Sequence, residues 1–340
     1  MLLSVALAAA LANICPADNG IAAICGPVAS EDIARIPGTR WLIASGLNIG
    51  SPANLHLVDS RNKLSRTLFP RNSPAFSMQA SFRGICPGPI QPERMSLDGV
   101  SVRSGENGAP ALLLAANHGD RHAIEFFRID MQPDPVLTWT GCVPMPKGTL
   151  ANSVVALSNG DMLVTSFHDP EDKQAWIRMN RGEATGGVWQ WTSNDGWKLL
   201  PIGGIAGANG LETSADERTL YVSAWASRQV LVFDRTRGSR RVIELDFLPD
   251  NIHRAVDGTL LVAGQRTSVR DIASCTAACP QPWVVARVDP GSGAVTPLLT
   301  GTGSETTNYA CGALEVDGTM FMTLRGAARI AWAPLAKGPR

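Results

Sequence analysis

A turn containing Gly or Asp, followed by an alternating apolar strand, recurs along the whole chain. The pattern occurs at residues 37–46, 108–118, 158–168, 215–225, 256–265 and 316–326. Several copies lead into a second apolar strand that ends in Asp, such as ANLHLVD. Alternation with a period of two residues indicates β-strands, and 33 Gly and 23 Pro favour many tight turns. The sequence therefore predicts an all-β chain of repeated units, with this strand–turn–strand pair as the outer hairpin of each unit.

Six copies at spacings of about 40 to 70 residues predict a six-bladed β-propeller. A single blade cannot bury both of its faces, whereas a closed ring packs each blade between two neighbours and removes exposed sheet edges. We predict one propeller domain over residues 13–340, without a linker. A β-sandwich with loop insertions is the alternative architecture.

The charge balance argues against polyanionic partners. Lys+Arg and Asp+Glu both number 30, which gives a formal net charge of +0, so the chain shows no electrostatic footprint for nucleic acid or an anionic membrane. After the N-terminus, no segment approaches the roughly 18 consecutive apolar residues of a membrane span. We therefore expect no nucleic-acid partner and no transmembrane segment, and leave the oligomeric state open.

The first dozen residues, MLLSVALAAALA, are apolar and end in an A-x-A-like site. We predict a secretory signal over residues 1–12, cut after Ala12, and export to the periplasm or the extracellular space. The segment lacks a basic beginning, so an apolar first strand is the alternative.

Seven cysteines are compatible with an oxidising compartment. Cys275 and Cys279 bracket the short loop CTAAC and could bridge there or pair elsewhere. No His or further Cys stands at zinc-ligand spacing beside them, so disulfides are the better interpretation. The odd count leaves at least one thiol free.

Polar residues recur near the starts of the predicted innermost strands, at about the blade period. They are Glu31, Asn117, His118, Asn152, Asn209, Asp250 and Asn251. Inner strands of a propeller converge on one axis, so carboxylate and amide oxygens at one register would face a common point. Such a set of hard oxygen donors suits calcium. Each residue taken alone could instead be an ordinary turn residue that accepts backbone hydrogen bonds.

Five of these segments, in order, resemble the paraoxonase/arylesterase family of hydrolases. They are SEDIARIPGTRWLIASGLN, NHGDRHAIEFFRID, ANSVVAL, GANGLETSADERTLYVSA and LPDNIHRAVDGTLLVAG. The resemblance extends over roughly residues 25–335; gluconolactonase-type and strictosidine-synthase-like propellers share the architecture as more distant relatives. It implies a calcium-dependent hydrolase of lactones or carboxylic (aryl) esters.

The resemblance also implies residue roles. The ligands of the catalytic calcium would be Glu31, Asn152, Asn209, Asp250 and Asn251. His118 matches the family's histidine beside the metal and is the candidate general base, while the calcium ion polarises the substrate carbonyl. Asp32, Asp120 and Ser153 match part of a second, structural calcium site, where Ser153 replaces an aspartate.

Two further positions depart from the family pattern. Thr138 stands where the partner histidine of the family's His–His dyad is expected, and Gln265 replaces another histidine. His122 and His168 are nearby histidines that could orient the base or line the pocket.

No G-x-S-x-G or G-x-G-x-x-G motif supports serine esterase chemistry or dinucleotide binding. Nine tryptophans, including WQW at 189–191, could form an aromatic rim, although packing inside the blades explains most of them better. The segment 265–282 is expected to shape the entrance. A calcium-stabilised scaffold or small-molecule binding protein without turnover is the competing function.

Overall fold

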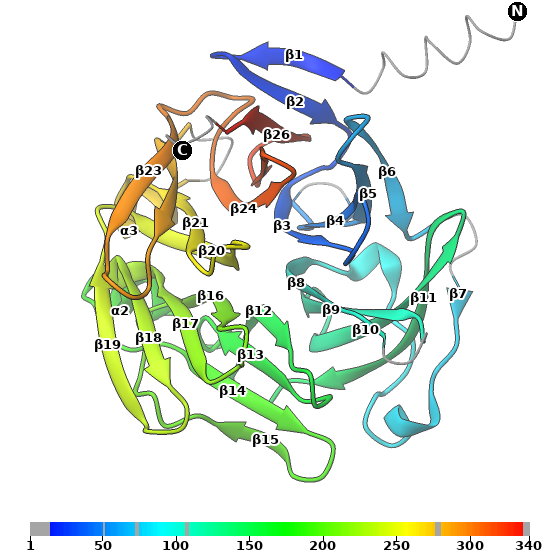
Figure 1. Cartoon of the computed structure of the whole chain (residues 1–340). Helices are drawn as coiled ribbons and strands as arrows, with labels where there is room; N and C mark the ends of the chain where they lie inside the picture. Colours follow the sequence, from blue (N-terminus) through cyan, green and yellow to red (C-terminus); the bar gives the residue numbers. More distant parts are fainter. Residues whose placement is uncertain (1–13, 50–51, 72–74, 106–108, 276–279, 336–340) are drawn as a thin grey trace, which may run out of the picture.

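The computed structural model describes residues 14–49, 52–71, 75–105, 109–275 and 280–335. Its strands form six small sheets that stand as blades around a central axis (Figure 1). The described chain is therefore a six-bladed β-propeller, which confirms the fold predicted from the repeats. The predicted signal segment, residues 1–12, lies outside the described residues. No helix among the described residues is long and apolar enough to cross a membrane.

Four blades are simple four-stranded sheets whose strands run outward from the axis in chain order. The first contains β3 (Ser30–Arg35), β4 (Trp41–Gly46), β5 (Leu55–Asp59) and β6 (Leu64–Phe69). The third contains β12 (Ala151–Ala156), β13 (Met162–Ser166), β14 (Gly187–Thr192) and β15 (Gly196–Leu199). The fourth contains β16 (Ala208–Thr213), β17 (Thr219–Ala224), β18 (Gln229–Asp234) and β19 (Ser239–Glu244). The fifth contains β20 (Leu248–Arg254), β21 (Leu260–Gln265), β22 (Trp283–Val288) and β23 (Val295–Gly301).

The other two blades have a fifth strand. The second contains β8 (Leu97–Arg103), β9 (Ala111–His118), β10 (His122–Gln132) and β11 (Asp134–Pro144), with β7 (Ala75–Phe76) parallel to β11 at its edge. The sixth contains β24 (Ala310–Val316), β25 (Thr319–Leu324) and β26 (Arg329–Pro334), extended by β2 (Ile21–Cys25) and β1 (Ile14–Asp18).

The recurring strand–turn–strand pair is the centre of each blade, and the prediction that it is the outer hairpin was wrong. In the first blade the pair corresponds to β4 and β5, with β3 inside it and β6 outside it. Both faces of these middle strands pack against neighbouring blades, so β5 is buried at every position. The outermost strand β19 is exposed at five of its six positions. Outer strands therefore carry many polar residues, and their pattern is too weak to be found as a repeat.

The ring is closed by strands from opposite ends of the chain. β2 pairs antiparallel with β26, with Ala22 opposite Trp332 and Cys25 opposite Arg329. The side chain of Ile24 in β2 is fully buried in a cluster with Ile33 and Phe321. The first and last segments thus complete one sheet, which leaves no open seam between the first and sixth blades (Figure 1).

Two disulfides join described cysteines, Cys15–Cys25 and Cys86–Cys142. The first links β1 to β2 beside the ring closure, and the second ties the loop before β8 to β11. Cys275 is also disulfide-bonded, while the Cys279 end of the CTAAC loop lies outside the described residues. Cys311 is a free, buried thiol, in agreement with the odd cysteine count.

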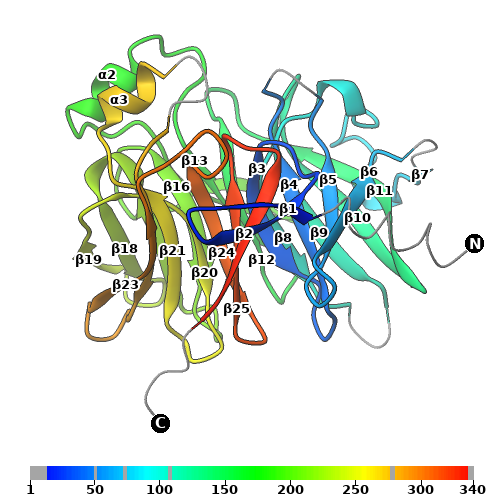
Figure 2. The ribbon, with the colours of Figure 1, turned by 90° about the horizontal axis from the view of Figure 1, so that it is seen from above.

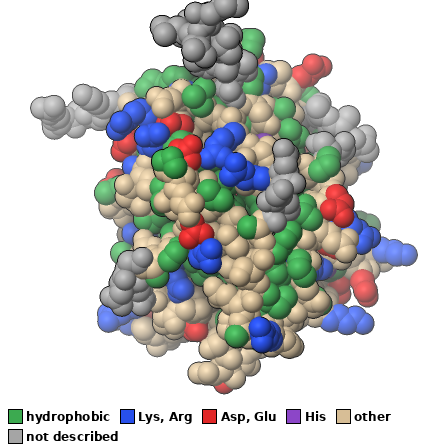
Figure 3. Space-filling model, turned by 90° about the vertical axis from the view of Figure 1, so that its right-hand side faces the viewer, with side chains coloured by type: hydrophobic (Ala, Val, Ile, Leu, Met, Phe, Trp, Pro, Cys, Tyr) green, Lys and Arg blue, Asp and Glu red, His purple; other side chains and the backbone are tan. Residues whose placement is uncertain are grey.

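Short helices lie on one face of the ring. α2 (Ala175–Asn180) and α3 (Val269–Ala273) pack against each other there (Figure 2). Three single 3₁₀ turns, η1 (Ala80–Phe82), η2 (Pro92–Arg94) and η3 (Trp225–Ser227), complete the helical elements of the described chain. On the side of the ring shown in Figure 3, basic, acidic and apolar side chains alternate over short distances, as the balanced composition leads one to expect.

Replacement of Ile24 by Ala tests whether β2 holds the ring closed. Because Ile24 is 0% exposed, we expect Ile24→Ala to lower the free energy of unfolding by about 2–5 kcal/mol. The control is Leu199→Ala, because Leu199 is 57% exposed in an outer strand. Urea denaturation of both variants under oxidising conditions measures the difference. Equal, small effects in the two variants would contradict the role given to β2.

Candidate active site

All six innermost strands carry a β-bulge at the same place. In β3, Ser30 and Ile33 pair with Gly46 and Ala44, so Glu31 and Asp32 together oppose a single residue of β4. The same shift of register occurs in the other five inner strands. A bulge turns its side chains out of the regular alternation. The first bulge residues are Glu31, Asp98, Asn152, Asn209, Asp250 and Cys311, and all six line one cavity of about 200 Å³.

The second bulge position alternates around the ring between a side chain and glycine. The side chains are Asp32, Ser153 and Asn251, and the glycines are Gly99, Gly210 and Gly312. A Cβ atom at Gly99 would lie 2.6 Å from the Cα atom of Ser153, and one at Gly210 would lie 2.7 Å from the Cα atom of Asn251. The bulges of neighbouring blades are therefore in such close contact that only every second one can carry a side chain there.

Hydroxyl groups on the second strands hold these bulges in place. Thr165 donates to the carbonyl oxygen of Asn209 at 2.6 Å, Ser223 to that of Asp250 at 2.6 Å, and Thr323 to that of Glu31 at 2.7 Å. Each bond joins one blade to the next at the level of the site. The backbone carbonyls of these three bulge residues are thereby satisfied inside the channel wall, and their side chains are fixed.

Four buried side-chain oxygens at the site accept no hydrogen bond from the described residues. They are Oδ1 of Asn152, Asn209, Asp250 and Asn251. A buried acceptor without a partner is costly, and Asn152, Asn209 and Asp250 line the same cavity, so their three oxygens indicate a missing positively polarised partner. The donor set, oxygen-rich and drawn from several blades, fits a hard divalent cation such as calcium. These four residues are all among the ligands predicted from the sequence.

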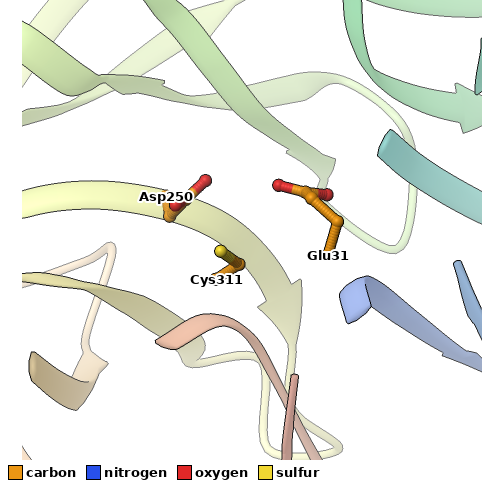
Figure 4. Close-up of side chains that lie close together, drawn as sticks. All are labelled: Glu31, Asp250 and Cys311. Carbon is orange, nitrogen blue, oxygen red and sulfur yellow. The ribbon is translucent and has the colours of Figure 1, made fainter. Parts of the chain in front are cut away.

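The acidic groups at the site repel one another. Glu31, Asp250 and Cys311 have ligand atoms within 4.8 Å of one another, and the Glu31 and Asp250 carboxylates point toward each other (Figure 4). Burial raises the pKa of Glu31 well above its ordinary value, and the charges of Asp98 and Asp250 raise it further. Burial likewise raises the pKa of Asp250. A bound cation would relieve this repulsion, so the cluster is a possible acidic metal site.

Asn251 and Gln265 fix the two central carboxylates. The Nδ2 atom of Asn251 donates to both carboxylate oxygens of Glu31, at 3.1 Å each. Gln265, which stands where the family pattern has a histidine, donates from Nε2 to Oδ2 of Asp250 at 2.9 Å. Trp225 in turn donates to the amide oxygen of Gln265. In this arrangement Gln265 orients a predicted ligand and leaves Oδ1 of Asp250 free for the cavity.

His118 is paired with Asp98, a residue that the sequence analysis did not identify. The Nε2 atom of His118 lies 2.8 Å from Oδ2 of Asp98, and Asn152 donates to the same oxygen at 3.2 Å. Burial lowers the pKa of His118, but the charge of Asp98 and its hydrogen bond outweigh burial, so the pKa lies above the ordinary value. Asp98 thus orients the imidazole and favours its protonated form.

The other residues considered as partners of His118 have different surroundings. Thr138 lies in β11, where it pairs with Arg128 of β10 and Ala75 of β7, and it is not among the residues that line the cavity. His122 is the cross-strand neighbour of His118, and burial, followed by the charges of His118 and His168, lowers its pKa. His168 lines the cavity, and its Nδ1 atom lies 2.8 Å from the carbonyl oxygen of Asp169.

The residues predicted for a structural calcium do not form a common site. Oδ1 of Asp32 lies 2.7 Å from Nε2 of His253, and its Oδ2 accepts from the backbone N–H of Val100 at 2.9 Å. Ser153 lines the same small cavity as Asp32 and His253, whereas Asp120 does not and lies beside Arg94, 3.9 Å away. The carboxylate of Asp32 already has a close partner in His253, whose pKa is lowered by burial but raised above its ordinary value by the charge of Asp32 and its hydrogen bond, so these residues do not fit a second ion.

Asp98 and Cys311 complete the six-residue set, and the sequence held a signal for both. Asp98-Gly99, Asn209-Gly210 and Cys311-Gly312 share one pattern, a buried apolar residue followed by a polar residue or cysteine and then glycine. Asn209 was recognised because its oxygen suits calcium, whereas Cys311 offers a thiol. Burial raises the pKa of Cys311 well above its ordinary value, so the neutral thiol is favoured in this cluster.

No protein-family model matches the chain, and no curated protein matches it in sequence. Solved structures do match. A luciferin-regenerating enzyme is 12% identical with a TM-score of 0.58, over 92% of this chain and 93% of that one. A gluconolactonase from Xanthomonas campestris is 19% identical with a TM-score of 0.56, over 96% of this chain and 93% of that one. A chain of a nidogen/laminin complex is 10% identical with a TM-score of 0.52, over 87% of this chain and 85% of that one.

At these identities the likeness shows the fold alone. The neighbours include a gluconolactonase-like propeller, in agreement with the broader part of the resemblance seen in the sequence. The narrower resemblance to paraoxonases and arylesterases stays a prediction.

Calcium titration tests whether the orphaned oxygens bind an ion. We expect saturating calcium to raise the thermal midpoint by several degrees, because an ion that binds only the folded state stabilises it. Asn209→Ala removes one unpaired Oδ1, so about tenfold more calcium should be needed for the same rise in thermal midpoint. Asn159→Ala, on an exposed turn, is the control. An unchanged midpoint in calcium, or an Asn209→Ala variant that responds like the unaltered protein, would contradict the assignment.

His253→Leu tests the Asp32–His253 pair. Because Asp32 is 2% exposed, loss of its partner should cost about 3–5 kcal/mol of unfolding free energy. The double variant Asp32→Asn with His253→Leu should recover part of that loss. If added calcium restored the single variant to full stability, Asp32 would instead belong to a second calcium site.

Proposed function

We propose that the chain is a metal-dependent hydrolase of lactones or carboxylic esters. One observation carries the proposal: the six inner strands bring carboxylates and unpaired oxygens to the wall of a single cavity, where the end of β9 adds His118 as the partner of Asp98. A cavity with convergent polar groups and perturbed pKa values is where an active or binding site is expected. The gluconolactonase and luciferin-regenerating enzyme among the structural neighbours are compatible with this chemistry at the level of the fold.

The residues that would hold the ion are Glu31, Asn152, Asn209 and Asp250. Asn251, predicted from the sequence as a fifth ligand, does not line the cavity and instead orients Glu31 through hydrogen bonds from its Nδ2 atom. When bound, calcium supplies Lewis acidity toward the substrate carbonyl and neutralises the oxyanion that develops on it. The protein's own contribution is to hold hard oxygen donors on bulges that the hydrogen bonds between blades keep fixed. The substrate carbonyl would therefore enter a site that is organised in advance.

His118 is the proposed general base, with Asp98 as its orienting partner. When neutral His118 donates Nε2–H to Asp98, the lone pair is on Nδ1, and this nitrogen takes the proton from the attacking water. Asp98 stabilises the imidazolium that forms. This replaces the His–His dyad expected from the family pattern with an Asp–His pair contributed by two adjacent strands, β8 and β9.

His118→Gln tests the base directly. Loss of a positioned base should lower kcat about 100-fold or more toward γ-lactones or phenyl acetate in the presence of calcium. Calcium affinity, measured on the same variant by thermal shift, should change little. Unchanged kcat in His118→Gln would remove His118 from the reaction and leave the metal assignment standing.

Asp98→Asn tests the pairing through the pH profile. Because the charge of Asp98 raises the pKa of His118, its removal should lower that pKa. Since the base acts only when deprotonated, the acidic limb of kcat/KM should shift to lower pH. A limb that stays in place, or shifts to higher pH, would contradict the pairing.

A calcium-stabilised binding protein without turnover is the second candidate, and the nidogen/laminin chain among the neighbours favours keeping it. A panel of γ- and δ-lactones and phenyl acetate, assayed in calcium and in EDTA, separates the two. Hydrolysis that disappears in EDTA supports the hydrolase. Calcium binding without hydrolysis of any compound would favour the binding protein.

A further inference from the structure

The cavity of the candidate active site adjoins a second, larger cavity. The inner cavity of about 200 Å³ holds the six bulge residues, and a larger one of about 540 Å³ lies next to it. Trp176, Ile272, Tyr309 and Arg325 line both, so they form the neck between them. Trp176 is on α2 and Ile272 is on α3. Ile272 lies within segment 265–282, which was expected to shape the entrance.

The wall of the outer cavity is largely apolar. Val28, Ile49, Ile272 and Ala327 are among the residues that form it. Arg325 is the one charged side chain among its described lining residues. The WQW segment is not at the entrance, because Trp189 and Trp191 pack against a hydrophobic core. The aromatic residues at the neck are Trp176 and Tyr309.

The guanidinium of Arg325 lies beside an aromatic ring and forms no ion pair with a described carboxylate, while the charges of Asp98 and Asp250 act on it from the inner cavity. Its Cζ atom lies 5.3 Å from the centre of the Tyr309 ring, and the backbone N–H of Arg325 donates to the carbonyl oxygen of Tyr309 at 3.2 Å. Within the described part of the chain, no carboxylate lies within 4.0 Å of this guanidinium and no acceptor is hydrogen-bonded to it. Its side chain is open to the cavity. Arginine in such a place offers a planar pair of donors that matches a carboxylate.

We propose that Arg325 is a specificity-determining residue that binds the free carboxylate of an acidic lactone or ester. The proposal rests on the proposed function, and it names the class of substrate. An anionic group placed among Glu31, Asp98 and Asp250 would be repelled, so the carboxylate lies at the neck and the uncharged carbonyl at the inner cavity. The apolar wall accommodates the carbon skeleton, and Arg325 selects among lactones by their charge.

A matched pair of substrates tests the selection by charge. The pair is 5-oxotetrahydrofuran-2-carboxylate and its carboxamide, which differ in charge and little in shape. In saturating calcium, we expect kcat/KM for the carboxylate to exceed that for the carboxamide by about 10- to 100-fold, mainly through KM. In Arg325→Met the ratio should fall to about one, and Arg325→Lys should keep part of it.

Arg241→Met is the control variant, because it removes the same charge from an exposed position on the outer strand β19. Its substrate ratio should equal that of the unaltered protein. An Arg325→Met variant that keeps the full preference for the carboxylate would overturn the proposal.

Binding measurements separate this proposal from the hydrolase assignment. The lactam 5-oxoproline and its amide mimic the two lactones but resist hydrolysis, so calorimetry in saturating calcium reports recognition alone. If neither lactone is hydrolysed but 5-oxoproline binds about tenfold or more tightly than its amide, and Arg325→Met abolishes this difference, the hydrolase assignment fails and the role of Arg325 stands. The role of Arg325 would be overturned if the two lactams bind equally or not at all and the carboxylate lactone is also not hydrolysed in preference to its carboxamide.

Discussion

The close contact of six backbones around the axis determines what this channel can hold. At the level of the bulges, a Cβ atom on Gly99, Gly210 or Gly312 would come within about 3 Å of atoms in the next blade. Three glycines and three side chains therefore alternate at the second bulge position. The first bulge position is open to the cavity, and there all six residues carry functional groups. Because the second bulge position is crowded, polar side chains from all six blades can converge only at the first bulge position.

The convergence of carboxylates at the first bulge position creates a repulsion between them, and the chemistry of the site depends on how that repulsion is relieved. Glu31, Asp98 and Asp250 share one buried region. Burial and the charges of Asp98 and Asp250 raise the pKa of Glu31, and burial and the charge of Asp98 raise the pKa of Asp250. The basic side chains nearby are His118, which is paired with Asp98, and Arg325, which lies at the neck without a hydrogen-bonded partner among the described residues. A metal ion at the centre and a guanidinium at the entrance would place positive charge along the path of a substrate, with the imidazole of the proposed base beside them. This ordering links the metal, the base and the choice of substrate.

The sequence predicted the ring because its middle strands are apolar and regularly spaced. It also predicted Glu31, Asn152, Asn209 and Asp250 as a convergent set, since oxygen-bearing residues at one register stand out in apolar strands. Asp98 was missed because its role as partner of His118 depends on contact between two strands of one blade, and Cys311 because a thiol does not suit calcium. The Asp32–His253 pair was equally hidden, because 221 residues separate the two partners. The open guanidinium of Arg325 is likewise a property of three-dimensional placement and not of any motif.

A crystal structure of the protein with calcium, with the ion located by its anomalous scattering, examines the central claim most directly. We predict one ion on the axis, with oxygens of Glu31, Asn152, Asn209 and Asp250 at about 2.3–2.6 Å from it. An ion bound elsewhere, or a calcium-soaked crystal in which these four side chains contact only one another and water, would contradict it.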